Sequence, residues 1–262
     1  MLYDSNFSEK EDKGFIYYID SLDFRLPGEL LTAYVSFCRF KRNYKSATAC
    51  NFLNEGELEY FKSLSFQRRR NSYLLGRYAA KMAVSSLANE EDLKKIVIRN
   101  GVFNHPVLKY GLNNIQISIT HCEDIGAAIA FSDMLLLGLD IERNNPDMYK
   151  VMEREMTQFE KELANRMPIS YGCFLVMAWT LKESLSKVLK TGLTIPTFLL
   201  EIKDIEIYND YFICKFSNFP QYNAVSFFCG NYCCSISYPG NIETLMNIDR
   251  IKNNVDALIK YD

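Results

Sequence analysis

The chain has 262 residues with 30 basic and 32 acidic side chains, a net charge of −2, which excludes a general nucleic-acid coat because that function needs a basic surplus. Its 18 Phe and 17 Tyr residues exclude intrinsic disorder as the main state. The polar, acidic first residues predict no secretion signal, and the broken apolar runs predict no membrane span. We therefore expect a cytoplasmic protein with no membrane or nucleic-acid partner.

The first half of the chain predicts both helices and strands. Residues 28–37 fit either type. Strands are expected where β-branched and aromatic residues dominate or alternate with polar ones, and helices where apolar residues recur every three or four positions. The strands are 15–20, 94–100, 115–120 and 125–131, the last two forming a hairpin, and the helices are 54–65 and 65–87.

The second half opens with the segment MLLLGLDIE, residues 134–142, which we predict to be a strand. Leu135, Leu137, Leu139 and Ile141 fall on one face of it, because side chains alternate along a strand. Thr157 and Glu160 form a capping-box pattern that predicts a helix start, and residues 171–189 carry a helical apolar stripe.

Residues 198–238 read as three or four further strands. Helices and mostly antiparallel strands thus come in two similar batches. This organisation predicts an α+β fold with an N-terminal lobe, 1–133, and a C-terminal lobe, 134–262.

Carboxylates are the most informative polar residues. Asp140 and Glu142 share the second face of the predicted strand with Gly138, whose missing side chain would let a ligand approach the backbone. Glu183 and Lys187 are i,i+4 neighbours on the later helix. Carboxylates drawn together repel, and oxygen ligands of this kind suit Mg²⁺. The competing interpretation is a solvated strand face and a surface ion pair, and spacing alone does not decide whether Glu183 meets the strand.

The eight cysteines form no C-x-x-C pair, and with two histidines in the chain this argues against a structural zinc site. Their even number leaves disulfides open. We favour reduced thiols that fill the core.

Two segments together resemble the 4′-phosphopantetheinyl transferases of the monomeric, two-lobed, surfactin-synthetase-activating type. That family shows a G-[VI]-D-x-E strand and, some 40 residues later, a helix with W-[ST]-x-K-E-[SA]-x-x-K. Here the strand reads GLDIE from Gly138 to Glu142, and the helix reads WTLKESLSK from Trp179 to Lys187. Upstream, LLGR ending at Arg77 is similar to a family helix, and Thr120-His121-Cys122 stands where relatives carry S-H-S.

Some positions depart from the family pattern. The family's glycine-to-proline loop often reads G-K-P, whereas four residues separate Gly101 from Pro106 here, so the expected lysine is missing. Thr120 keeps the hydroxyl of the first serine of S-H-S. Cys122 replaces the second serine, and its thiol is a poorer hydrogen-bond donor than a serine hydroxyl. We expect these departures to affect the coenzyme A pocket and not the metal centre.

The resemblance implies a pseudo-dimer of two lobes, each a small antiparallel sheet on a long helix, with coenzyme A in the cleft between them. The implied reaction is a Mg²⁺-dependent transfer of 4′-phosphopantetheine from coenzyme A to a serine of an apo acyl or peptidyl carrier protein, which releases adenosine 3′,5′-bisphosphate. The carrier would belong to fatty-acid, polyketide or nonribosomal-peptide synthesis. A single chain with both lobes is expected to be a monomer.

The resemblance also implies roles for individual residues. Asp140, Glu142 and Glu183 would hold Mg²⁺, with Glu183 acting as ligand, as base for the serine proton, or as both. Lys187 would act on the diphosphate. The residues implied in coenzyme A binding are His121, Thr120, Arg69, Arg70, Arg77 and Lys182.

Two other functions stay open: a non-catalytic coenzyme A or carrier-protein binding module on the same fold, and an unrelated Mg²⁺ phosphohydrolase with similar carboxylates. The intact Asp140, Glu142, Glu183 and Lys187 argue against the first of these.

Overall fold

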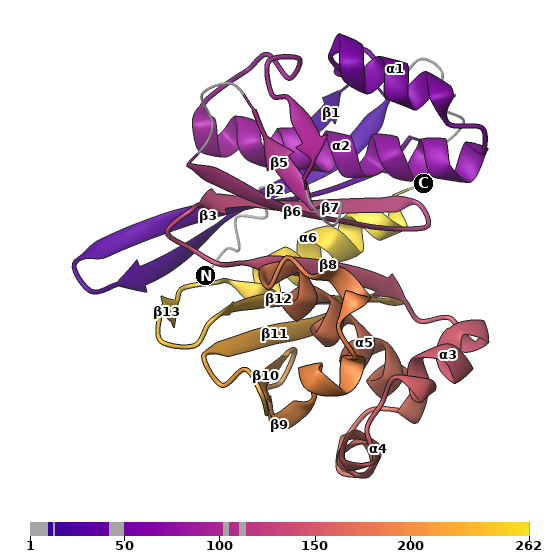
Figure 1. The fold of residues 1–262 in the computed structure, drawn as a ribbon, viewed down its shortest axis with the longest axis vertical. Helices are drawn as coiled ribbons and strands as arrows, with labels where there is room; N and C mark the ends of the chain where they lie inside the picture. Colours follow the sequence, from indigo (N-terminus) through magenta and orange to yellow (C-terminus); the bar gives the residue numbers. More distant parts are fainter. Residues whose placement is uncertain (1–9, 13, 42–49, 102–104, 110–113, 262) are drawn as a thin grey trace, which may run out of the picture.

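The computed structural model describes residues 10–12, 14–41, 50–101, 105–109 and 114–261. Two antiparallel sheets organise these residues (Figure 1). The first has the order β1-β2-β3-β7-β6, and β13 adds to it alongside β2. Its strands are β1 Lys10–Asp12, β2 Phe15–Leu26, β3 Glu29–Phe40, β6 Ile115–Cys122, β7 Ile125–Ser132 and β13 Glu243–Thr244.

The second sheet has the order β8-β12-β11-β10-β9, and a separate two-stranded sheet joins β4 to β5. The strands of the second sheet are β8 Gly138–Arg143, β9 Ile202–Ile207, β10 Phe212–Phe216, β11 Tyr222–Cys229 and β12 Tyr232–Pro239. The small sheet consists of β4 Ile98–Asn100 and β5 Pro106–Leu108. The chain passes from the first sheet to the second between Ser132 and Gly138.

The helices lie against the sheets. The long helix α2 packs on the first sheet and the long helix α5 on the second. In the described part of the chain, none of the helices is long and apolar enough to reach across a membrane. The helices are α1 Glu55–Ser63, α2 Gln67–Ala88, α3 Tyr149–Arg154, α4 Gln158–Ala164, α5 Tyr171–Val188 and α6 Ile248–Lys260, with short 3-10 turns at Pro146–Met148, Gly192–Thr194 and Thr197–Leu200.

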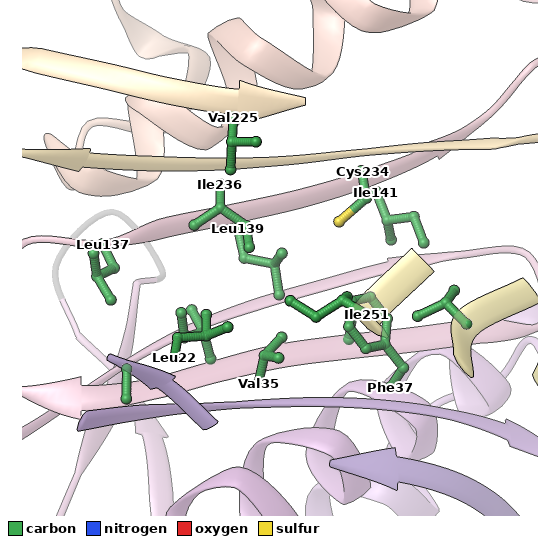
Figure 2. Close-up of a cluster of buried hydrophobic side chains, with 14 of the residues drawn as sticks. Leu22, Val35, Phe37, Leu137, Leu139, Ile141, Val225, Cys234, Ile236 and Ile251 are labelled. Carbon is green, nitrogen blue, oxygen red and sulfur yellow. The ribbon is translucent and has the colours of Figure 1, made fainter. Parts of the chain in front are cut away.

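The two sheets face each other across a shared apolar core. Leu22 and Val35 come from the first sheet and Leu139 and Ile236 from the second, and Figure 2 shows them pointing into the same cluster. The apolar side of α6, represented by Ile251, enters the core between the sheets. The layers therefore run helix α2, sheet, sheet, helix α5, with α6 inserted between the sheets (Figure 1).

The mixed fold with antiparallel sheets confirms the α+β prediction. The ambiguous residues 28–37 belong to strand β3 from residue 29 onward, because β2 and β7 pair with this strand on both sides. The predicted strand 134–142 begins at Gly138, although the face formed by Leu135, Leu137, Leu139 and Ile141 is buried as expected. Helix α6 was not predicted, although its buried residues recur at helical spacing: Ile248, Ile251, Val255 and Leu258.

Both halves of the chain contain the series strand, short helix, long helix and hairpin, with different elements inserted between its members. They are β3, α1, α2, β6 and β7 in the first half and β8, α4, α5, β11 and β12 in the second. In each half a lysine of the long helix pairs with the glutamate of the short helix's capping box. Lys81 meets Glu57 and Lys182 meets Glu160, and all four side chains are buried.

The C-terminal segment does not stay with the second sheet. Strand β13 pairs with β2, and Arg250 of α6 binds the buried Asp20 of β2 through its Nε at 2.8 Å. The division into lobes 1–133 and 134–262 remains a prediction.

Candidate active site

The site is centred on Asp140, in the middle of β8. Only 3% of its surface is exposed. Its Oδ1 accepts hydrogen bonds from Thr120 Oγ1 at 2.8 Å and from Lys187 Nζ at 2.7 Å, whereas its buried Oδ2 has no hydrogen-bond partner among the described residues. Because an unpaired buried carboxylate oxygen is costly, this atom favours binding of a cation.

Asp140 is electrostatically coupled to both other predicted carboxylates. Burial raises the pKa of Glu142 to about 7, and the charge of Asp140 adds to the shift. Burial and then Asp140 likewise raise the pKa of Glu183 to about 7. Lys187 opposes both shifts. The fold thus brings the acidic pair of β8 near Glu183 and Lys187 of α5, although 41 positions lie between Glu142 and Glu183 in the chain.

The donor chemistry fits a hard cation. All three side chains offer carboxylate oxygens, which Mg²⁺ prefers, and the Oδ2 atom of Asp140 has no hydrogen-bond partner among the described residues. Within the described residues, no three His, Cys, Asp or Glu side chains are grouped closely enough to be recognised as a metal site. The Mg²⁺ site therefore remains a prediction, supported by donor type and charge.

Lys182 does not belong to this site. Its side chain is fully buried, and Nζ donates to Glu160 Oε2 at 2.7 Å and to the Glu155 carbonyl at 2.8 Å. The structure contradicts the predicted contact of Lys182 with coenzyme A, because the fully buried ammonium group is paired with Glu160. Lys182 and Lys187 project from α5 about 140° apart at 3.6 residues per turn, so they face different surroundings.

Gly138 serves packing and does not open the backbone to a ligand. A Cβ atom at this position would lie 2.0 Å from the Ser184 carbonyl oxygen of α5. The space expected beside Gly138 is therefore filled by the helix, and the glycine lets α5 approach β8 closely enough to bring Glu183 and Lys187 to Asp140.

The predicted arginines divide into different environments. Arg69 is exposed on α2. Arg70 Nε donates to the Leu64 carbonyl at 2.6 Å. Arg77 stacks over Tyr73 at 5.1 Å and lines an open cavity of about 700 Å³ that also includes Asn100. Of these three, Arg77 alone has a guanidinium that lines a described cavity, which favours it as a ligand contact.

His121 and Thr120 lie at the end of β6 that faces the acidic strand. Thr120 binds Asp140, so it acts on the carboxylate site and not only on the expected coenzyme pocket. Burial lowers the pKa of His121, and the charges of Lys187 and Arg68 lower it further. Arg68, which was not among the predicted contacts, therefore acts electrostatically on His121.

Cys122 also differs from its predicted role. Its Sγ donates to Glu142 Oε2 at 3.3 Å and accepts from the Arg143 backbone N–H at 3.3 Å. We expected this departure from S-H-S to affect only the coenzyme A pocket, whereas Cys122 contacts Glu142, which is a predicted metal ligand. The period-two alternation of β6 placed Thr120 and Cys122 on one face, but the sequence did not show which strand lies opposite.

A cavity of about 190 Å³ lies beside Lys187, between β6, the residues before β8 and the end of α5. Apolar side chains such as Ile119 and Leu137 line it together with His105 and Lys190. Neither His105 nor Lys190 was predicted from the sequence to belong to a site. Most of the loop between Gly101 and Pro106, at 102–104, lies outside the described residues.

Two comparisons with known proteins bear on this site. The ACPS family model, described as the 4′-phosphopantetheinyl transferase superfamily, matches residues 136–237 and so includes β8 and α5. A holo-[acyl-carrier-protein] synthase from Staphylococcus carnosus (strain TM300) is 32% identical over 81 residues, which cover 29% of this chain and 69% of that relative.

Proposed function

The chain belongs to the 4′-phosphopantetheinyl transferase superfamily, and on this premise we propose that it transfers the 4′-phosphopantetheine group of coenzyme A to a serine of an apo carrier protein. The products are the holo carrier protein and adenosine 3′,5′-bisphosphate. The observation that carries the proposal is the buried Asp140, whose charge acts on Glu142 and Glu183 and whose Oδ1 binds Lys187.

Asp140, Glu142 and Glu183 are the residues that would hold Mg²⁺. When bound, the ion neutralises negative charge on the diphosphate and on the leaving phosphate. Phosphoryl transfer depends mainly on positioning and electrostatics, so carboxylates fixed by a strand and a helix suit it. Thr120, on strand β6 of the first sheet, holds Asp140 in place through its hydrogen bond to Oδ1.

Glu183 is the proposed general base. The serine oxygen forms a bond to the pantetheine-side phosphorus, the bond from that phosphorus to the bridging diphosphate oxygen breaks, and the serine proton passes to the Glu183 carboxylate. Its pKa of about 7 matches this role, because a base works best when its pKa lies near the working pH.

Lys187 and His121 are the proposed contacts to the phosphates. Lys187 Nζ has three N–H donors and uses two of them on Asp140 Oδ1 and the Leu139 carbonyl. The third is available for the diphosphate. Lys187 and Arg68 disfavour the protonated form of His121. A phosphate beside His121 would favour that form, so the imidazole would take up a proton when coenzyme A binds. Arg77 is a further proposed contact to coenzyme A.

We also propose that the repeated order of elements represents a pseudo-dimer that places coenzyme A between two lobes. The hydrogen bond from Thr120 of the first sheet to Asp140 of the second marks the seam between the sheets and supports this arrangement. Because one chain supplies both sides of that seam, a monomer would be sufficient for activity.

The decisive experiment incubates the protein with coenzyme A, Mg²⁺ and a panel of apo carrier proteins and follows the intact mass of each carrier. We expect a gain of one phosphopantetheine group on at least one carrier, lost when EDTA replaces Mg²⁺. Unmodified carriers despite binding of coenzyme A would contradict the proposal and favour a binding module. Breakdown of coenzyme A without a carrier would favour a phosphohydrolase.

A further inference from the structure

The side chains that strand β6 points toward β8 form a regular ladder. Ser118 Oγ accepts from the Leu139 backbone N–H at 3.0 Å, and Thr120 Oγ1 donates to Asp140 at 2.8 Å. Cys122 continues the series two residues later, with its Sγ 3.3 Å from Glu142 Oε2. Because alternate residues of a strand share one face, β6 supplies hydrogen bonds along the length of the acidic strand.

We propose that Cys122 is a positioning residue for the reaction: its thiol orients the Glu142 carboxylate toward the cation site. The inference rests on the proposed function. A backbone bond fixes the thiol itself, since the Arg143 N–H donates to Cys122 Sγ at 3.3 Å. Cys122 thus bridges the backbone of β8 and the side chain of Glu142, and it leaves the other carboxylate oxygen, Oε1, for a ligand.

A second observation, independent of the cysteine, indicates where that ligand lies. The Asp140 side chain is only 5% exposed, and its Oδ2 has no partner among the described residues. Thr120 and Cys122 therefore act alike: each occupies one oxygen of a β8 carboxylate and leaves the other for a cation. Hydrogen-bond partners of metal ligands typically change metal affinity by about 10–100-fold when they are removed.

The test compares Cys122→Ala, which removes the donor, with Cys122→Ser, which keeps one. Mg²⁺ binding is measured by calorimetry with coenzyme A present and no carrier, so the readout does not depend on transfer. We expect Cys122→Ala to weaken Mg²⁺ binding about 10-fold or more and Cys122→Ser to restore most of it. In transfer assays, excess Mg²⁺ should recover the rate of Cys122→Ala. Cys173→Ala is the matched control, since Cys173 is also half-buried and bonded, to Asn144 Nδ2 at 3.3 Å.

Equal Mg²⁺ affinity in Cys122→Ala and the unmodified protein would overturn the inference, as would equal weakening in the Ala and Ser variants. If Cys122→Ala did not fold, methylthiolation of the unmodified protein would remove the same donor. Cys122→Ser should resist the effect of that reagent, and equal loss of Mg²⁺ binding in both proteins would overturn the inference. Absence of transfer to every carrier with normal Mg²⁺ binding would instead count against the proposed function alone.

Discussion

Lys187 Nζ lies 2.7 Å from Oδ1 of Asp140, and this pair joins helix α5 to the acidic strand β8. The aspartate side chain is almost completely buried and the lysine side chain is 23% exposed. Lys187 therefore neutralises a charge that burial would otherwise disfavour. Because its side chain is partly exposed, a diphosphate could reach its amino group.

Lys187→Met should abolish most transfer, because it removes both the partner of Asp140 and the proposed phosphate contact. We expect a loss of at least about 100-fold in kcat/KM, measured by the mass shift of a carrier protein. Lys203→Met is the control, since Lys203 is exposed on β9, at the edge of the second sheet opposite β8. Activity of Lys187→Met within a few fold of the unmodified enzyme would remove Lys187 from the mechanism.

Glu183→Gln should abolish transfer while the fold is preserved. The amide keeps the size of the side chain but cannot take a proton, and a positioned base typically contributes about 10²–10⁴ in rate. Intact mass of the carrier measures transfer, and circular dichroism checks the fold. The exposed Glu206 provides a control variant, Glu206→Gln. Unchanged turnover in Glu183→Gln would show that another group accepts the serine proton.

Gly138→Ala should destabilise the protein and reduce transfer together. The added methyl group would meet the Ser184 carbonyl, which is helix backbone and cannot move without shifting α5. We expect a loss of about 1–3 kcal/mol in the free energy of unfolding, typical of overpacking, measured by urea denaturation. Gly56→Ala, whose methyl would have ordinary contacts, should change stability much less. An equally stable Gly138→Ala protein would contradict the close packing of β8 on α5.

Lys182→Met should cost stability without affecting coenzyme A binding. Lys182→Met would leave the buried charge of Glu160 unpaired. Removing one partner of a buried ion pair in this way costs about 3–5 kcal/mol of stability. Combining it with Glu160→Gln should recover part of the loss. Lys81→Met, which breaks the corresponding pair with Glu57, should behave alike. A stable Lys182→Met protein with a raised KM for coenzyme A would instead support the predicted contact between Lys182 and coenzyme A.

The contribution of Glu142 and Glu183 to stability, without added Mg²⁺, should fall as pH rises from about 4.5 to about 7. Glu142 and Glu183 have an ordinary pKa of 4.5 and a folded-state pKa of about 7. The folded protein therefore holds more protons than the unfolded chain in this range, so rising pH favours unfolding. Urea midpoints measured in EDTA at several pH values test this.

The control is the double variant Glu142→Gln and Glu183→Gln, because neutral amides do not titrate. The difference in free energy of unfolding between this variant and the unmodified protein should grow with pH. Mg²⁺ should reduce the difference near neutral pH by stabilising the ionised carboxylates. A pH-independent difference would show that both carboxylates titrate normally in the folded protein.

Much of the local structure followed from the sequence. The apolar face that includes Leu139 and Ile141 indicated a strand, and the stripe along residues 171–189 indicated a helix, because burial selects a period of two or of 3.6. The spacing of Asp140 and Glu142 likewise set both carboxylates on one face. These are local properties, which the chain's own geometry determines.

Only the tertiary structure decided what each of these faces meets. Helical geometry predicts that Lys182 and Lys187 point in different directions. It cannot show that Lys182 pairs with Glu160 and Lys187 with Asp140. Nor could it show that Cys122 reaches Glu142. Such contacts join segments that are distant in the chain, and they depend on how the helices pack on their sheet and on how the two sheets pack against each other.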